Sequence, residues 1–235
     1  FHMTAALRVL LAMLLLPAVL SSGTALAVDA ELIKQLGSSE VSDKVRAIEA
    51  LTRTADPLGL PILRALRGGN MAVTPSGQVI VLDAGVAKDA VTLQPLDPQP
   101  TEYESVVVNN RVRGQLDAAF SAFQLFSDSR DERLAAAKEL ESSAQASVGP
   151  ILEKVLATET DPTIKGVLAQ LKAGIDLKSG DPQVRMAAVK VLGQSSVQRT
   201  KQLLYALLEQ DSSGAHTEPD ATVREAAQVA IKAID

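Results

Sequence analysis

The polar cluster that stands out in this 235-residue sequence is formed by Asn109, Asn110, Arg111 and Arg113. Two amides and two guanidinium groups in close succession can donate hydrogen bonds to carbonyl and carboxylate groups, so the cluster is a candidate protein-binding patch. The alternative is a corner between a strand and a helix, because asparagine tolerates turn dihedrals and its side chain caps nearby backbone N–H groups. We favour the corner, and the pattern leaves both interpretations open.

The chain contains 2 histidines and no cysteine, which restricts its chemistry. His216 lies in a polar stretch between Asp211 and Asp220 and could bind a metal weakly, but a loop that ends in a helix cap is the simpler interpretation. With His2 at the extreme N-terminus, a Ser–His–Asp arrangement has no support. No glycine-rich phosphate loop follows a predicted strand. We therefore expect no catalytic residue, no metal and no cofactor, and a chain that is not an enzyme.

Composition argues for one globular domain, or one domain with an appendage, and against nucleic acid as a partner. Hydrophobic residues make up 46% of the chain, and its formal net charge is −5 with no run of lysine and arginine. Aromatic residues are only 3% and tryptophan is absent, so base-stacking platforms are not expected. Phe120, Phe123 and Phe126 are interpreted as core packing rather than as an aromatic ligand box.

The N-terminus has the pattern of a secretory signal peptide. Phe1-His2 is interpreted as a cloning remnant, and residues 3–27 contain a basic start, an apolar run over Val9–Leu20 and an A-x-A cleavage site at Ala25–Ala27. The apolar run is shorter than the ~20 residues that a membrane span requires. Cleavage would leave Val28 first and place the domain outside the cytoplasm. In the uncleaved chain we expect this run to pack as a helix into a groove, which is a route to self-association.

Four segments of the chain share a helical pattern and define a repeat. When they are aligned on their last apolar residue, a basic side chain and an alanine recur at fixed positions. The same spacing separates Leu51 from Leu140 and Pro61 from Pro150, so two successive helices are repeated together. The basic residues are Lys44, Arg133, Arg185 and Arg224, and the alanines are Ala47, Ala136, Ala188 and Ala227.

A single helix pair of this kind cannot bury its apolar faces, whereas stacked pairs can. Asp161-Pro162 and Asp181-Pro182 each supply a capping carboxylate followed by a proline for the first helical turn. The spacing of the helix starts is irregular, so at least one pair is incomplete. The segments resemble HEAT-like repeats. The predicted fold is therefore mainly α, a HEAT-like α-solenoid of helix pairs over residues 28–235 with a small β-hairpin-containing insertion.

The predicted insertion interrupts the helices at about residues 67–110. Gly68-Gly69-Asn70 ends the preceding helix, and residues 74–77 (Thr-Pro-Ser-Gly) form a turn between the two strands of a hairpin. Helical spacing resumes at Leu116. The predicted strands are Met71–Val73, Gln78–Leu82, Val91–Leu93 and Tyr103–Val108.

The order of these features resembles a known family. A signal sequence, an early helix pair, Gly68-Gly69-Asn70 before a hairpin, and the run Val107–Leu140 are similar to the extracytoplasmic N-terminal region of the B-type permease of bacterial urea-type ABC transporters. These permeases are related to the branched-chain amino acid permeases. The resemblance spans Met3–Asp235, and Val107–Leu140 is its most specific part.

The resemblance implies a non-catalytic periplasmic domain in front of a membrane-spanning permease that imports urea or short-chain amides. Its implied partners are a second permease protein, two ATPases and a substrate-binding protein, and its implied task is docking of that binding protein or assembly of the transporter. No apolar stretch after the signal is long enough to cross a membrane, so the membrane spans that the resemblance implies would have to follow Asp235. The alternative is a free-standing periplasmic repeat scaffold with another protein partner. An enzyme, such as a lyase of the kind that some HEAT-like proteins resemble, would need a pocket with convergent polar groups.

Overall fold

Four helices at the N-terminal end of the described chain pack around one core. The computed structural model describes residues 28–143, 145–195 and 197–234. The predicted signal peptide, the cloning remnant and the expected docking of the apolar run lie outside these residues. The first helix begins where the side chain of Asp29 accepts a hydrogen bond from the backbone N–H of Glu31. The helices of this group are α1 (Ala30–Gly37), α2 (Val41–Thr54), α3 (Gly59–Arg67) and α4 (Asn110–Gln124).

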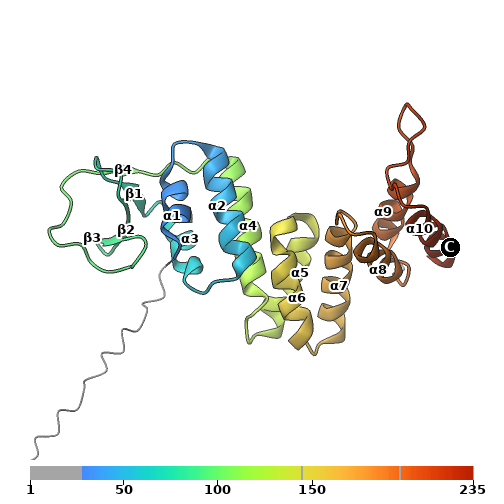
Figure 1. The fold of residues 1–235 in the computed structure, drawn as a ribbon. Helices are drawn as coiled ribbons and strands as arrows, with labels where there is room; N and C mark the ends of the chain where they lie inside the picture. The colour runs from blue at the N-terminus through green and yellow to red at the C-terminus, as the bar shows by residue number, and fades with distance from the viewer. Residues whose placement is uncertain (1–27, 144, 196, 235) are drawn as a thin grey trace, which may run out of the picture.

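A four-stranded antiparallel sheet lies between α3 and α4 in the sequence and at one end of the molecule (Figure 1). The strand order is β3-β2-β1-β4, with Met71 paired to Val81 and Ala72 paired to Ser105. Gly77 adopts a φ of 85° in the turn between the first two strands, at the place that the sequence predicted. The strands are β1 (Met71–Val73), β2 (Val79–Asp83), β3 (Val86–Asp89) and β4 (Glu104–Ser105).

One strand prediction was wrong and another was wrong in part. Residues 91–93 form a turn instead of a strand, because the carboxylate of Asp89 accepts hydrogen bonds from the backbone N–H groups of Val91 and Thr92 at 2.9 Å. Leu93 then takes a φ of 58°, which no strand residue adopts. The predicted strand over Tyr103–Val108 is reduced to the two residues of β4.

The remaining helices follow one another away from the sheet along an elongated molecule (Figure 1). Asp161 and Asp181 cap α7 and α8, and a proline follows each aspartate as the first helical residue, as the sequence predicted. The described chain is therefore mainly helical with a small antiparallel sheet, which confirms that part of the predicted fold. These elements are α5 (Arg130–Ser143), the short 3₁₀ helix η1 (Ala146–Val148), α6 (Gly149–Thr158), α7 (Pro162–Asp176), α8 (Pro182–Leu192), α9 (Gln198–Leu208) and α10 (Ala221–Ile234).

Three clusters of buried apolar side chains form successive cores along the helices, and a small fourth lies on one face of the sheet. Helix α4 contributes Ala119 to the first core and Ala122 to the second. Helix α7 contributes Leu168 to the second core and Ala173 to the third. Neighbouring cores are thus joined by helices that belong to both.

The alanine of the repeat is buried in all four copies. Ala47 and Ala227 are 0% exposed, and Ala136 and Ala188 are 2% exposed. Because the side chain is a single methyl group, neighbouring helices can approach closely at this position. The predicted buried face is therefore confirmed.

The arginines at the basic position of the repeat hold the loop that precedes their own helix. Arg133, Arg185 and Arg224 each donate hydrogen bonds from Nη1 to main-chain carbonyls five or six residues earlier, over 2.8–3.1 Å. These bonds satisfy loop carbonyls that no helix or strand would pair. Lys44, at the same position of α2, is buried at 3% exposure.

Two of these arginines also bind a glutamate that lies just before a later helix. Arg133 donates from Nε and Nη2 to Glu159 over 2.9 and 3.3 Å, and Arg185 donates in the same way to Glu218 over 2.7 and 2.8 Å. Each glutamate lies two residues before the aspartate that starts a later helix, and its Oε1 accepts the backbone N–H of that aspartate. Both glutamate side chains are 2% exposed. The two bidentate pairs therefore fix the start of α5 against that of α7, and the start of α8 against that of α10.

Candidate functional site

Asn109 makes the corner between the sheet and α4. Its Oδ1 accepts a hydrogen bond of 3.0 Å from the backbone N–H of Val112, and Asn110 is the first residue of the helix. The chain before it is tied to β1 by a hydrogen bond from the N–H of Val106 to the carbonyl of Met71. The corner role predicted for this asparagine is therefore present as a helix N-cap.

The other three residues of the predicted patch are exposed but do not share one face. Among the residues that the structure describes, the side chains of Arg111 and Arg113 form no ion pair. Helical spacing places Arg113 in line with Asp117 and Phe120, whereas Arg111 projects from the opposite side of α4. The structure thus separates Arg111 from the surface of α4 that carries Phe120.

That surface is an open groove between α3 and α4, with a volume of about 650 Å³. It contains three of the 4 phenylalanines of the chain, Phe120, Phe123 and Phe126. The guanidinium carbon of Arg67 lies 4.9 Å from the centroid of the Phe120 ring, and its Nη2 lies 2.8 Å from Oδ1 of Asp117. The groove therefore combines aromatic rings with Arg67, which stacks on Phe120 and lies beside Asp117.

The interpretation of these phenylalanines as core residues agrees with the packing of Phe120 and Phe123 and is wrong for Phe126. Phe126 is 50% exposed, and Phe120 and Phe123 are only partly buried against the first core. The reason is that α4 ends at Gln124 and the next buried residue is Leu125, so Phe126 leaves the helix on the solvent side. Sequence reasoning missed the groove, although Asp117 on the face of Phe120 was a signal that this face is not wholly apolar.

Helix α3 supplies the opposite wall of the groove. Arg64 and Arg67 lie in its last turn, where cations interact favourably with the partial negative charge of the helix end. Gly68 caps the helix and Gly69 adopts a φ of 73°, so the chain turns away into β1 immediately after Arg67. Gly68 and Gly69, which the sequence predicted as the end of the helix, thus leave Arg67 at the edge of the groove.

The loop around His216 closes on itself. The carboxylate of Asp211 accepts hydrogen bonds from the backbone N–H groups of Ser213 and Ala215, and the Ser213 hydroxyl holds the pKa of Asp211 below its usual range. His216 Nε2 lies 3.1 Å from Nε2 of Gln210. Within the described residues, no group of three or more metal-binding side chains is present. The loop interpretation of this stretch agrees with that geometry.

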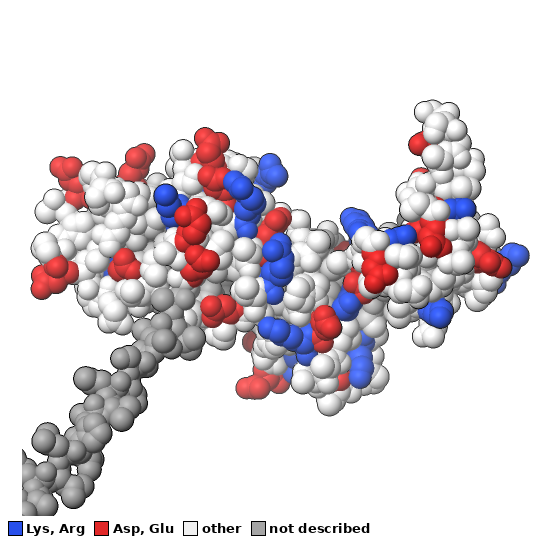
Figure 2. Space-filling model, viewed as in Figure 1, with Lys and Arg blue, Asp and Glu red and all other residues white. Residues whose placement is uncertain are grey.

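On the face shown in Figure 2, charge does not single out one part of the helices. Acidic and basic side chains are interspersed over the helical part of the face in Figure 2, and acidic side chains predominate at the sheet end. The charged residues between Asn70 and Val108 are Asp83, Lys88, Asp89, Asp97, Glu102 and Glu104. Exposed aromatic surface, rather than charge, therefore distinguishes the α3–α4 groove.

Comparisons of the chain with family models, curated proteins and solved structures gave no match. Among the helices of the described residues, none combines the length and the apolarity that crossing a membrane requires. The geometry of the groove is therefore the main observation from which a function can be argued.

Proposed function

We propose that this chain is a protein-docking module and that the α3–α4 groove is its binding surface. The observation that carries the proposal is Phe126, a phenylalanine that is half exposed beside the stacked pair of Arg67 and Phe120. Aromatic and arginine side chains are enriched at the centres of protein interfaces, where they supply most of the binding free energy. A partner that covers the groove would bury these rings beside Arg67, whose guanidinium group already lies over Phe120 and next to Asp117.

The finer architecture that we propose is a HEAT-like α-solenoid of stacked helix pairs. Its support is the recurring helix start, in which a capping residue is followed four positions later by Arg133, Arg185 or Arg224. The bidentate pairs to Glu159 and Glu218 also recur between units. A stacked array of this kind presents an extended surface suited to binding another protein.

The biological setting that we propose comes from the sequence resemblance. It is a periplasmic, non-catalytic domain of a urea-type ABC importer, whose groove docks the substrate-binding protein or stabilises assembly with the permease. The run Val107–Leu140, on which the resemblance mainly rests, includes all three groove phenylalanines. A free-standing periplasmic scaffold would use the same groove for another protein partner.

The test is a binding measurement with the substrate-binding protein and the permease complex of the same transporter. The variant Phe126→Ala should weaken binding by roughly 30-fold, which corresponds to about 2 kcal/mol for an interface hot spot. Tyr205→Ala is a matched control, because Tyr205 on α9 is 48% exposed and lies outside the groove. Biolayer interferometry on the three proteins would give the affinities.

Two results would count against the proposal in different ways. Equal losses for Phe126→Ala and Tyr205→Ala would show that the groove is not the docking surface. Absence of binding by the unaltered chain to both the substrate-binding protein and the permease would remove the transporter setting. Circular dichroism of each variant establishes that a loss of affinity does not come from unfolding.

A further inference from the structure

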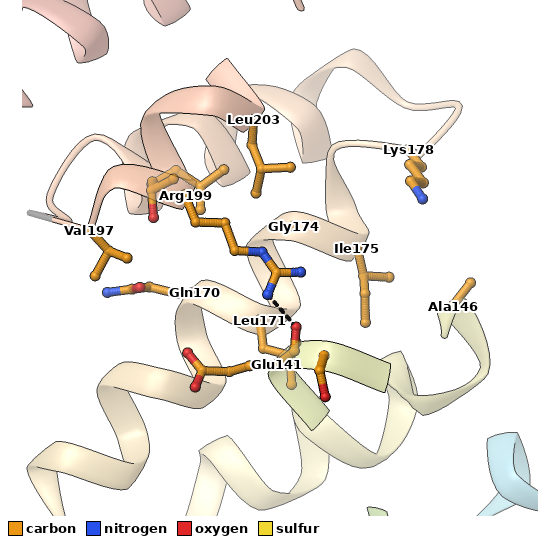
Figure 3. A pocket seen from close by; sticks show the side chains of 13 residues that line it. Glu141, Ala146, Gln170, Leu171, Gly174, Ile175, Lys178, Val197, Arg199 and Leu203 are labelled. Carbon is orange, nitrogen blue, oxygen red and sulfur yellow. Dashed lines mark hydrogen bonds between the residues drawn. The ribbon is translucent and has the colours of Figure 1, made fainter. Parts of the chain in front are cut away.

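A second hollow lies on a different part of the molecule, between the end of α5, α7 and α9 (Figure 3). Its volume is about 230 Å³, below the range of roughly 300–1,000 Å³ for drug-sized ligands. Leu171, Ile175 and Leu203 form most of its apolar lining, and all three are only partly buried. We call this hollow the α7–α9 cleft.

The order of the helices explains why the cleft is open. Helix α7 is followed directly by α8, which starts a new unit with its own aspartate cap, and not by a second helix of its own. Leu171, Gly174 and Ile175 lie on one side of α7 at helical spacing. Gly174 adds no side chain to that side, and Leu203 of α9 lies 3.7 Å from the position that a Cβ would take there. An apolar strip of α7 is thus left uncovered beside α9.

Three charged side chains line the cleft, the cations Arg199 and Lys178 and the anion Glu141. Arg199 of α9 donates from Nη1 to the main-chain carbonyl of Glu141, and Figure 3 shows its guanidinium group reaching across the cleft. Within the described residues, no carboxylate is paired with Arg199 or with Lys178, which also lines the cleft. By contrast, the buried guanidinium of Arg185 holds a carboxylate through two hydrogen bonds.

We propose that the α7–α9 cleft binds a small amphiphilic carboxylate. A short aliphatic chain would cover Leu171, Ile175 and Leu203, and the carboxylate would accept hydrogen bonds from Arg199. Guanidinium groups bind carboxylates most strongly where water is excluded, which the apolar lining favours. The small volume favours a free short-chain carboxylate over a peptide, whose backbone would bring further amide groups into an apolar space.

The experiment is a methyl NMR titration of the isotope-labelled chain with octanoate. The methyl signals of Leu171, Ile175 and Leu203 should shift and reach saturation. Octanol and octylammonium test the role of the charge, and each should bind at least about tenfold more weakly than octanoate. Acetate tests the role of the chain and should not saturate the site.

Variants separate the two halves of the proposed site. Arg199→Gln should weaken octanoate binding by about tenfold and leave octanol binding unchanged, because only the carboxylate contact is lost. Gly174→Leu should abolish binding of both ligands, since its side chain fills the apolar part of the cleft. Arg53→Gln is the matched control, because Arg53 is an exposed arginine on α2 and should leave the affinity unchanged.

Three outcomes would overturn the proposal. Equal affinity for octanol and octanoate would show that no carboxylate is recognised. Unaltered octanoate binding by Arg199→Gln would show that the arginine is not the anchor. Tighter binding of the peptide acetyl-Gly-Gly-Leu than of octanoate would show that the cleft is a peptide C-terminus site and not one for small amphiphiles.

Discussion

The buried pair of Arg185 and Glu218 offers the sharpest test of how the helices are held together. Its two hydrogen bonds measure 2.7 and 2.8 Å, and the two side chains are 10% and 2% exposed. Glu218→Gln keeps the shape of the side chain but removes its charge, so the guanidinium of Arg185 stays buried beside a neutral group. Breaking a buried pair typically costs about 3–5 kcal/mol, and the remaining amide oxygen offsets part of this.

We therefore expect Glu218→Gln to lower the free energy of unfolding by about 2–3 kcal/mol. With a urea m-value of about 2–3 kcal/mol/M, the unfolding midpoint would fall by roughly 1 M. Asp83→Asn is the control, because Asp83 forms an exposed pair with Lys88 and should change stability by less than about 0.5 kcal/mol. Urea titrations followed by circular dichroism at helical wavelengths measure both variants.

A second prediction for Glu218→Gln concerns the pH dependence of stability. The hydrogen bonds from Arg185 hold the pKa of Glu218 below its ordinary value of 4.5, so the carboxylate stabilises the folded chain fully above pH 4.5 and progressively less as the pH falls through its lowered folded pKa. Acidification should destabilise the unaltered chain more than Glu218→Gln, because glutamine does not titrate. This account of the pair would be refuted if Glu218→Gln lost no more stability than Asp83→Asn. It would also be refuted if Glu218→Gln kept the pH dependence of the unaltered chain.

Two further predictions concern local geometry. Asn109→Ala should lower stability by about 1 kcal/mol through loss of the N-cap of α4, while Asn109→Ser should retain most of it; thermal melts compare the two. Gly193→Ala should lower the melting temperature, because its Cβ would come within 2.8 Å of the Cβ of Ala230. Gly166→Ala should raise the melting temperature, because Gly166 lies inside α7 with open space around it and alanine favours the helix. An increase in melting temperature for both variants would contradict the packing of α8 against α10.

The helices were predictable because their pattern is local. Alanine at Ala47 and Ala136 marked the buried face, and Asp161 and Asp181 marked helix starts, so each signal lay within a few residues of its effect. The arginines of the repeat were found as a pattern, but Glu159 and Glu218 were not recognised as their partners. Glu159 lies 26 residues after Arg133, whereas Glu218 lies 33 residues after Arg185. Aligning the arginines therefore could not align the two glutamates.

The errors came from side chains that redirect the backbone or lie at the edge of an element. Asp89 accepts two backbone hydrogen bonds and turns a predicted strand into a loop, which a β-branched pattern around Val91 could not reveal. Phe126 was assigned to the core because the three phenylalanines were treated as one group. Its exposure depends on α4 ending at Gln124, and a helix end is harder to place from sequence than the helix itself.

Helix α4 is held in place by two of the buried cores at once. Its C-terminal half packs into two cores, through Ala119 in the first and Ala122 in the second, so the helix can tilt only if both cores repack together. One end carries Phe123 and the groove, and the other end is the corner at Asn109 from which the sheet returns. The aromatic groove and the corner at Asn109 are therefore two ends of one helix that the same two cores fix in place.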